Sequence, residues 1–141
     1  MSATSGASQY LENALSNWFR GTTFPAVPAN LYLALFTTAP ANGVTAGSVE
    51  VPSSNNYSRL AIVPNGTNFG APSGAAPNTM ASGANFVMAT PSGSWGTVVG
   101  WALFDASSAG NMLLYGTFTG VAVGNGDTVE FLTGNLTVTV S

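Results

Sequence analysis

The sequence contains no cysteine and no histidine. Without cysteine the chain has no disulfide bonds and no thiolate nucleophile, and without histidine it has no imidazole to act as a general base near neutral pH. Zinc sites built from these two residue types are excluded for the same reason. Packing must therefore stabilise the fold, and we expect neither a metal nor a cofactor.

Charged residues are scarce as well. They make up 5% of the 141 residues, against roughly 25% in an ordinary soluble domain. There is no lysine, and the two cations are Arg20 and Arg59. Nucleic-acid binding needs several cations on one face, so we expect no nucleic-acid partner. A surface with so little charge favours association, and we expect much of it to face protein.

Long apolar runs are missing too. No run reaches the ~18 residues of a membrane-spanning helix, and the N-terminal residues lack the basic and apolar regions of a signal peptide. We therefore expect no membrane partner, and a protein that is made and kept in a cytoplasm or inside something assembled there. The length favours a single domain, with a flexible N-terminal arm at residues 1–8 and a β-rich domain with an N-terminal helix at residues 9–141.

The first periodic segment follows this arm. Ser8 is a plausible N-cap, and Gly21 is a stop signal. Between them the apolar residues recur at the spacing of an amphipathic helix, at Leu11, Ala14, Leu15, Trp18 and Phe19. Two interpretations stay open, a lid packed on the sheet and a helix that docks on a partner.

The stretch WGTVVGWALFD, residues 95–105, is apolar on both alternating faces. If it is extended, Val99, Trp101 and Leu103 point to one side, and Val98, Ala102 and Phe104 point to the other. A strand of this kind is covered on both faces, so we predict the central strand of a sheet, with a bulge or a close backbone approach at Gly100. Residues 31–37 repeat the pattern and are the predicted neighbour.

Further short strands are predicted at residues 57–63, 84–89, 112–118, 128–132 and 136–140, and a short one at 49–51. We expect the last two to form a hairpin that turns inward Val129, Phe131, Leu136, Val138 and Val140. Long loops are expected at residues 39–56 and 67–83. The predicted fold is mainly β, an antiparallel β-sandwich of about seven or eight short strands with one N-terminal amphipathic helix.

Candidate chemistry is sparse. Asp127 and Glu130 are three apart on a predicted strand, which puts them on opposite faces. Asp105 beside Ser107 and Ser108 offers oxygen ligands but no calcium-loop spacing, and an Asp that opens a turn is the simpler interpretation. The aromatic residues considered for stacking on sugars are Tyr32, Tyr57 and Trp95, and core packing is the preferred interpretation. We predict no catalytic, cofactor-binding or metal-binding residues, and no enzyme.

Six segments resemble a family of small virion structural proteins of tailed bacteriophages, often named tail fibre or capsid decoration proteins. They are YLEN (10–13), PANLYLALFTTAP (28–40), YSRLAI (57–62), WGTVVGWALFDA (95–106), GDTVEF (126–131) and LTVTV (136–140). The resemblance implies a virion component, made in the host bacterial cytoplasm, with no catalytic residues.

The chain has no repeats or heptads from which a fibre shaft is built, so we rank a capsid decoration (cement) protein first and a tail fibre or tail-tip protein second. An unrelated sugar-binding module ranks third. The expected partners are the major capsid protein and further copies of the chain, as a homo-oligomer and most simply a trimer. The contacts are expected from residues 1–8, 39–56 and 67–83.

Overall fold

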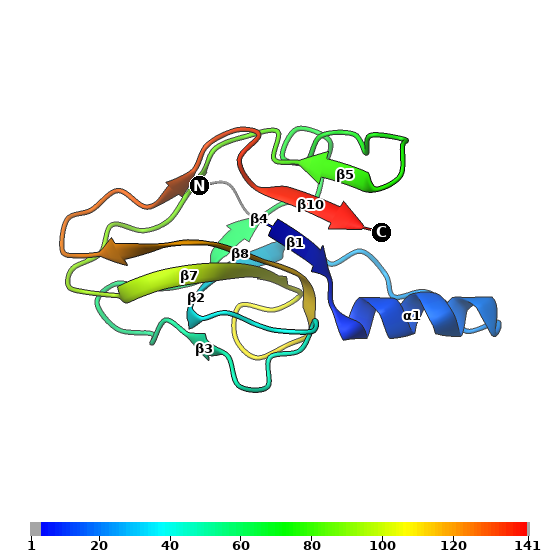
Figure 1. The fold of residues 1–141 in the computed structure, drawn as a ribbon, viewed down its shortest axis with the longest axis horizontal. Helices are drawn as coiled ribbons and strands as arrows, with labels where there is room; N and C mark the ends of the chain where they lie inside the picture. The colour runs from blue at the N-terminus through cyan, green and yellow to red at the C-terminus, as the bar shows by residue number, and fades with distance from the viewer. Residues whose placement is uncertain (1–3, 141) are drawn as a thin grey trace.

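The computed structural model describes residues 4–140. Within this range the chain forms short strands and one helix (Figure 1). In chain order the elements are β1 (Thr4–Ala7), α1 (Gln9–Phe19), β2 (Leu31–Thr38), β3 (Val49–Glu50), β4 (Leu60–Ile62), β5 (Asn78–Ala81), β6 (Phe86–Val87), β7 (Gly96–Phe104), β8 (Met112–Val123), β9 (Glu130–Phe131) and β10 (Thr137–Val140).

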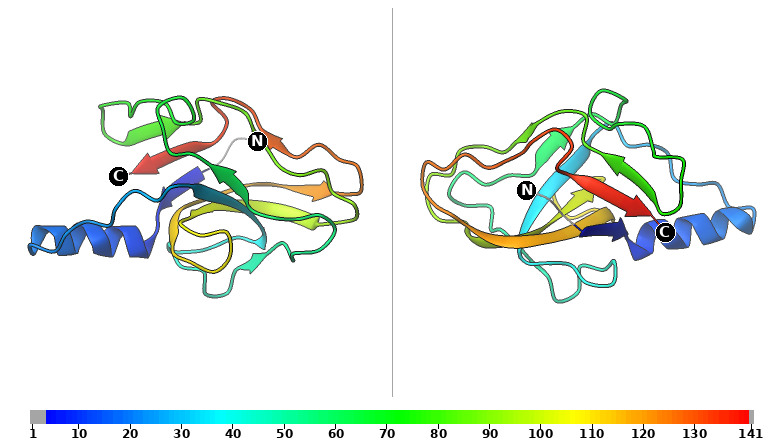
Figure 2. Two further views of the ribbon diagram at one scale, coloured as in Figure 1. Left: turned by 180° about the vertical axis from the view of Figure 1, so that it is seen from behind. Right: turned by 45° about the horizontal axis from the view of Figure 1, so that its top comes forward.

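The largest sheet has six antiparallel strands in the order β1-β8-β7-β2-β3, with β4 also paired to β2. Strand β7 is central, and it pairs with β2 from Phe104 opposite Tyr32 to Gly100 opposite Phe36. Two-stranded ribbons, β5 with β10 and β6 with β9, complete the fold, and Figure 2 shows the first of them lying above the large sheet. The mainly β, antiparallel prediction is confirmed, as is the predicted neighbour of the central strand.

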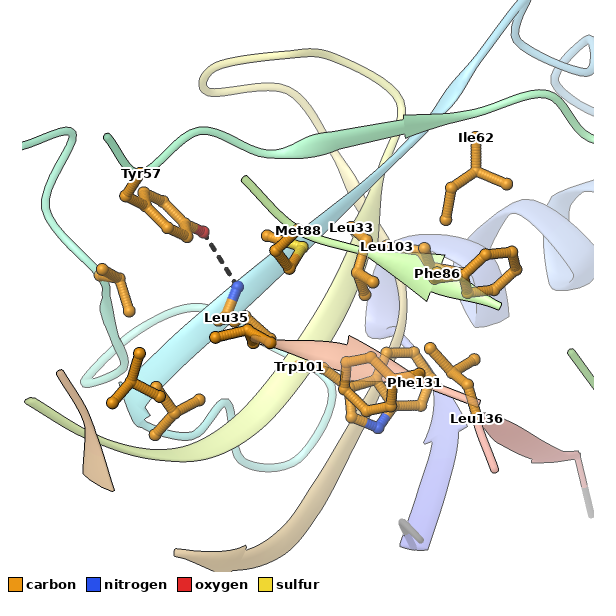
Figure 3. Close-up of a cluster of buried hydrophobic side chains, with 14 of the residues drawn as sticks. Leu33, Leu35, Tyr57, Ile62, Phe86, Met88, Trp101, Leu103, Phe131 and Leu136 are labelled. Atoms are coloured by element: carbon orange, nitrogen blue, oxygen red, sulfur yellow. Dashed lines mark hydrogen bonds between the residues drawn. The ribbon is translucent and has the colours of Figure 1, made fainter. Parts of the chain in front are cut away.

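Both faces of β7 are buried. On one face Trp101 and Leu103 are fully buried in a cluster with Phe131 of β9 and with Leu136, which directly precedes β10 (Figure 3). On the other face Ala102 and Phe104 belong to a second, smaller cluster with Phe36 and Met112. The two-sided apolar pattern of residues 95–105 thus reports burial on two sides.

Gly100 carries both expected features. The pairing of β7 with β8 shifts register between Val98 and Gly100, and a Cβ on Gly100 would lie 2.7 Å from the Cβ of Ala39. The shift corrects one detail of the predicted alternation. Val98, and not Val99, joins the cluster of Trp101 and Leu103, because an irregularity in the ladder changes which residues share a face.

The predicted C-terminal hairpin is wrong. Strand β9 pairs with β6 and β10 pairs with β5, so the two strands belong to different ribbons. The turn between them is fastened to Ser82 instead, whose backbone N donates to the carbonyl of Leu136 at 2.8 Å and whose carbonyl accepts from Gly134 N at 2.8 Å. The predicted loop 67–83 accordingly contains β5. The inward residues are buried as expected except Val140, which is 47% exposed at the end of β10.

The expected flexible arm is a strand over Thr4–Ala7, which runs antiparallel to β8 with Thr4 opposite Thr117. Small residues can form such a strand because the edge of β8 supplies backbone hydrogen bonds, which need no side-chain packing. Residues 1–3 of that prediction lie outside the described range. Ser8 then caps α1 as predicted, since its Oγ accepts a hydrogen bond from Leu11 N at 3.1 Å.

Candidate interaction surface

Two of the three carboxylates considered for chemistry, Asp105 and Asp127, stabilise turns. Asp105 accepts hydrogen bonds from the backbone N and the Nδ2 of Asn111, at 2.7 and 2.9 Å, and so closes the loop 105–111. Asp127 accepts from Gly124 N at 2.7 Å, while Glu130 lies on β9 opposite Val87. Residues 4–140 contain no cluster of three or more acidic side chains that would hold a metal ion.

The aromatic residues considered for sugar stacking are packed rather than presented. Tyr57 and Trp95 are 7% and 3% exposed, and their rings meet edge to face at 5.2 Å. Trp95 also donates from Nε1 to the carbonyl of Asn55 at 2.9 Å. Tyr32 is half-buried against the second core cluster. The preferred reading, core packing, is confirmed for Tyr57 and Trp95.

A polar cluster that sequence reasoning missed surrounds Arg59. Its guanidinium pairs with Glu50 at 2.9 and 2.7 Å, lies 3.8 Å from the ring centre of Phe104, and donates to the carbonyls of Ala106 and Ala109 at 2.9 Å each. Four of the five N–H donors of Arg59 are thus occupied within the fold. The sequence did contain one signal for this cluster, because Arg59 is one of two cations in the chain and lies within a predicted strand.

Tyr57 joins this cluster through its hydroxyl, which donates to Glu50 Oε1 at 3.0 Å. The same hydroxyl accepts a hydrogen bond from Leu35 N at 2.9 Å (Figure 3). Burial raises the pKa of Tyr57 well above its ordinary value, and the nearby charge of Glu50 adds to the effect, while the hydrogen bond from Leu35 acts against it. A phenol held neutral in this way serves as a fixed donor to Glu50.

Helix α1 and the chain that follows it expose a run of large apolar side chains. The helix extends away from the sheets (Figure 1), and no residue from 9 to 30 is buried. The lid interpretation is therefore wrong, because the helix contacts the sheet near its capped N-terminal end and leaves its apolar face open. Large apolar side chains are exposed along this projection, to 48% at Leu15, 53% at Trp18, 76% at Phe19, 40% at Phe24 and 78% at Val27.

A groove of about 660 Å³ lies where this projection meets the body. Helix α1 contributes Leu11, Glu12 and Leu15 to its wall, and the opposite wall includes Tyr115 of β8. Phe24 and Val140 complete its apolar lining. Glu12 is the sole charged residue of this lining. We call residues 9–30 the projection and this hollow the α1 groove.

No helix among residues 4–140 has both the length and the apolar character needed to cross a membrane.

The chain matches a known family. Residues 6–139 match the family model described as podophage GP4 fiber I protein gp80. Comparison with curated proteins gives no match. The matched range includes the projection, the whole of the central strand, and every residue that lines the α1 groove except Val140. This chain therefore belongs to the podophage fiber I protein family, and it is a structural protein of the bacteriophage virion.

Proposed function

We propose that the protein is a fibre subunit of the phage tail, built as a rigid β-domain that attaches to its neighbours through the projection. The observation that carries the proposal is that no residue from 9 to 30 is buried, although this segment exposes Trp18 and Phe19. Exposed apolar patches of this kind mark interaction sites. The family description, which names a fibre protein, supports the same assignment.

The short length of α1 supports attachment of the helix to a neighbouring molecule. The helix has 11 residues, and isolated helices shorter than about 12–15 residues are marginal in water. Proteins usually stabilise such a helix by burying one of its faces, and this chain does not bury one itself. A neighbouring molecule that covers Leu15, Trp18 and Phe19 would supply the missing stabilisation.

Capsid decoration is the second candidate, with the major capsid protein as partner. The observation that favours it is the composition, since seven charged residues in 141 leave a neutral exterior that suits repeated contacts with a protein shell. A trimer at local threefold positions of the shell stays a prediction under this candidate. Neither candidate function involves a chemical reaction. The carboxylates of Asp105 and Asp127 accept hydrogen bonds within their own turns.

Imaging of intact particles tests the two roles. Virions are labelled with gold-conjugated antibody fragments raised against the purified protein, and the label is located by electron microscopy. Label confined to the tail is the expected result. Label spread over the head lattice would overturn the fibre proposal in favour of decoration, and label on neither structure would overturn both.

A further inference from the structure

We propose that Asn42 is the site of a spontaneous covalent modification, deamidation through a cyclic imide formed with the backbone nitrogen of Gly43. The modified turn then loosens the start of α1, which packs against it. The proposal goes beyond the proposed function, because it holds whether the subunit lies on the tail or on the head.

The reaction needs only water. The nitrogen of Gly43 loses its proton and bonds to the side-chain carbonyl carbon of Asn42, the C–N bond of the side-chain amide breaks, and ammonia leaves. Water then opens the resulting five-membered imide at one of its two carbonyls. The products are an ordinary aspartate and an aspartate that is linked to Gly43 through its side chain. Glycine favours the attack because it has no Cβ to hinder a close approach.

The chain contains three Asn-Gly pairs, at residues 42–43, 65–66 and 125–126. The asparagine of each pair is exposed, so neither local sequence nor exposure distinguishes the three. Their hydrogen bonds do. Ring closure requires that the asparagine side chain be free to turn and that the glycine nitrogen be free to attack.

Two of the three pairs are blocked. Asn65 Oδ1 accepts hydrogen bonds from Thr67 N and Asn68 N, at 3.0 and 2.9 Å, and both must break before the side chain can turn. In the last pair the attacking nitrogen is occupied instead, because Gly126 N donates to the carbonyl of Pro91 at 2.9 Å. Both pairs must therefore lose native hydrogen bonds before they react.

The first pair lacks both blocks. Within residues 4–140 no hydrogen bond holds the side chain of Asn42 or occupies the nitrogen of Gly43. The bond that closes this turn, from Val44 N to the carbonyl of Ala41 at 3.1 Å, leaves the reacting atoms free. A hollow of about 370 Å³ lies between the turn and the start of α1, so water can reach the imide.

The side-chain-linked product disturbs the start of α1. The carbonyl of Gly43 accepts a hydrogen bond at 2.9 Å from the backbone N of Gln9, the first residue of the helix. The contact is tight, because a Cβ on Gly43 would lie 2.7 Å from Gln9 N and 3.1 Å from Ser8 Cα. Linkage through the side chain adds one carbon to the backbone of the turn. The Gly43 carbonyl then cannot keep its place beside Gln9, and α1 loses this contact with the body.

The first test is peptide mapping by mass spectrometry after the folded protein has been incubated at mildly alkaline pH. Trypsin cleaves after arginine, and the chain has Arg20 and Arg59 and no lysine. Residues 21–59 therefore carry Asn42, and residues 60–141 carry the other two pairs. Fragmentation of each peptide locates the deamidated residue.

Asn42 is expected to react at least about fivefold faster than Asn65 or Asn125, the factor that corresponds to one net hydrogen bond. Equal rates, or a faster reaction at either of the other two, would overturn the proposal. In urea the hydrogen bonds of the fold are lost, and the three residues are expected to react at similar rates. A preference for Asn42 that persisted in urea would show that the fold does not select it.

The second test measures hydrogen exchange of the Gln9 amide by NMR in fresh and aged protein. Asn42→Gly is the control, because glycine accepts the φ of 53° at this position and has no side-chain amide to lose. In aged wild-type protein that contains the side-chain linkage, Gln9 is expected to exchange at least about fivefold faster. The aged control is expected to exchange as the fresh control does. Unchanged exchange at Gln9 in the modified protein, or equal acceleration in the control, would overturn the effect on α1.

Discussion

Arg59 donates two parallel hydrogen bonds to Glu50, from Nε to Oε1 at 2.9 Å and from Nη2 to Oε2 at 2.7 Å. The same guanidinium donates to carbonyls of the loop 105–111. One side chain therefore fastens β3, the start of β4 and the β7–β8 connection together. Planar, two-pronged recognition of this kind is specific to arginine.

Arg59→Lys is expected to lower the free energy of unfolding by about 1–3 kcal/mol, because an ammonium cannot satisfy Glu50 and two carbonyls in the same fork geometry. Urea unfolding followed by fluorescence measures the change. Arg20→Lys is the control, and this exposed substitution is expected to stay within about 0.5 kcal/mol of the parent. Equal effects would show that the Arg59 cluster does not stabilise the fold.

Tyr57 predicts a loss of stability in alkali. Burial raises its pKa in the folded state above the ordinary value of 10.0, so the folded protein keeps the phenol proton that the unfolded chain releases above about pH 10. The stabilisation is complete below that pH and falls as the pH rises above it. Urea unfolding at a series of pH values from about 8 to 11 measures the slope.

Tyr57→Phe should flatten this alkaline slope. At neutral pH it should also cost about 1–3 kcal/mol, because Leu35 N and Glu50 lose a partner. Tyr10→Phe is the matched control, since Tyr10 is 37% exposed, and it should keep the slope. An unchanged slope in Tyr57→Phe would contradict the prediction.

Two tryptophans of opposite exposure give a second matched pair. Trp101 is fully buried and Trp18 is 53% exposed. Trp101→Ala is expected to cost roughly 3–5 kcal/mol, a large part of the ~5–15 kcal/mol that holds a domain together. Trp18→Ala should leave the monomer nearly as stable as the parent. Thermal melts at low protein concentration compare them, and a parent-like melt for Trp101→Ala would refute its role in the core.

Gly100 predicts an asymmetry between two glycines. A Cβ at Gly100 would lie 2.7 Å from the Cβ of Ala39 and 3.0 Å from the carbonyl of Gly116, whereas a Cβ at Gly66 meets nothing within 4 Å. Gly100→Ala is therefore expected to cost about 1–3 kcal/mol through overpacking, and Gly66→Ala to be neutral or slightly stabilising. Denaturant midpoints test the order, and the reverse order would contradict the close approach.

Metal removal should have no effect on stability. The chain has neither cysteine nor histidine, and residues 4–140 contain no cluster of acidic residues suited to a metal. Dialysis against a chelator should leave the melting temperature unchanged. A fall of more than a few degrees, reversed when a divalent cation is restored, would show a site formed in some other way.

The central strand could be predicted from the sequence because a strand that is apolar on both faces must be buried on both faces. The strands at residues 95–105 and 31–37 could each be predicted from their own residues, without reference to the rest of the chain. Gly100 was readable for a similar reason, since a glycine within a strand marks a position where another backbone comes close. These features are local, and local patterns encode them.

The partners of the C-terminal strands were not readable. Pairing of β9 with β6 and of β10 with β5 depends on the contact of Ser82 with Gly134 and Leu136, which joins residues far apart in the chain. The Arg59 cluster has the same origin, because Arg59 reaches Ala106 and Ala109 across another part of the sequence. An amphipathic pattern likewise shows that one face of α1 is apolar, but not what covers that face.

The exposure of Trp18 has an optical consequence. Of the three tryptophans, Trp95 and Trp101 are 3% and 0% exposed, so Trp18 is the one that water and small quenchers reach. Collisional quenching by acrylamide should therefore report on the projection and not on the core. When another molecule covers the helix, the emission of Trp18 should shift to the blue, and acrylamide should quench it less. The unmodified chain thus carries an intrinsic fluorescent probe, which can follow its incorporation into a particle in real time.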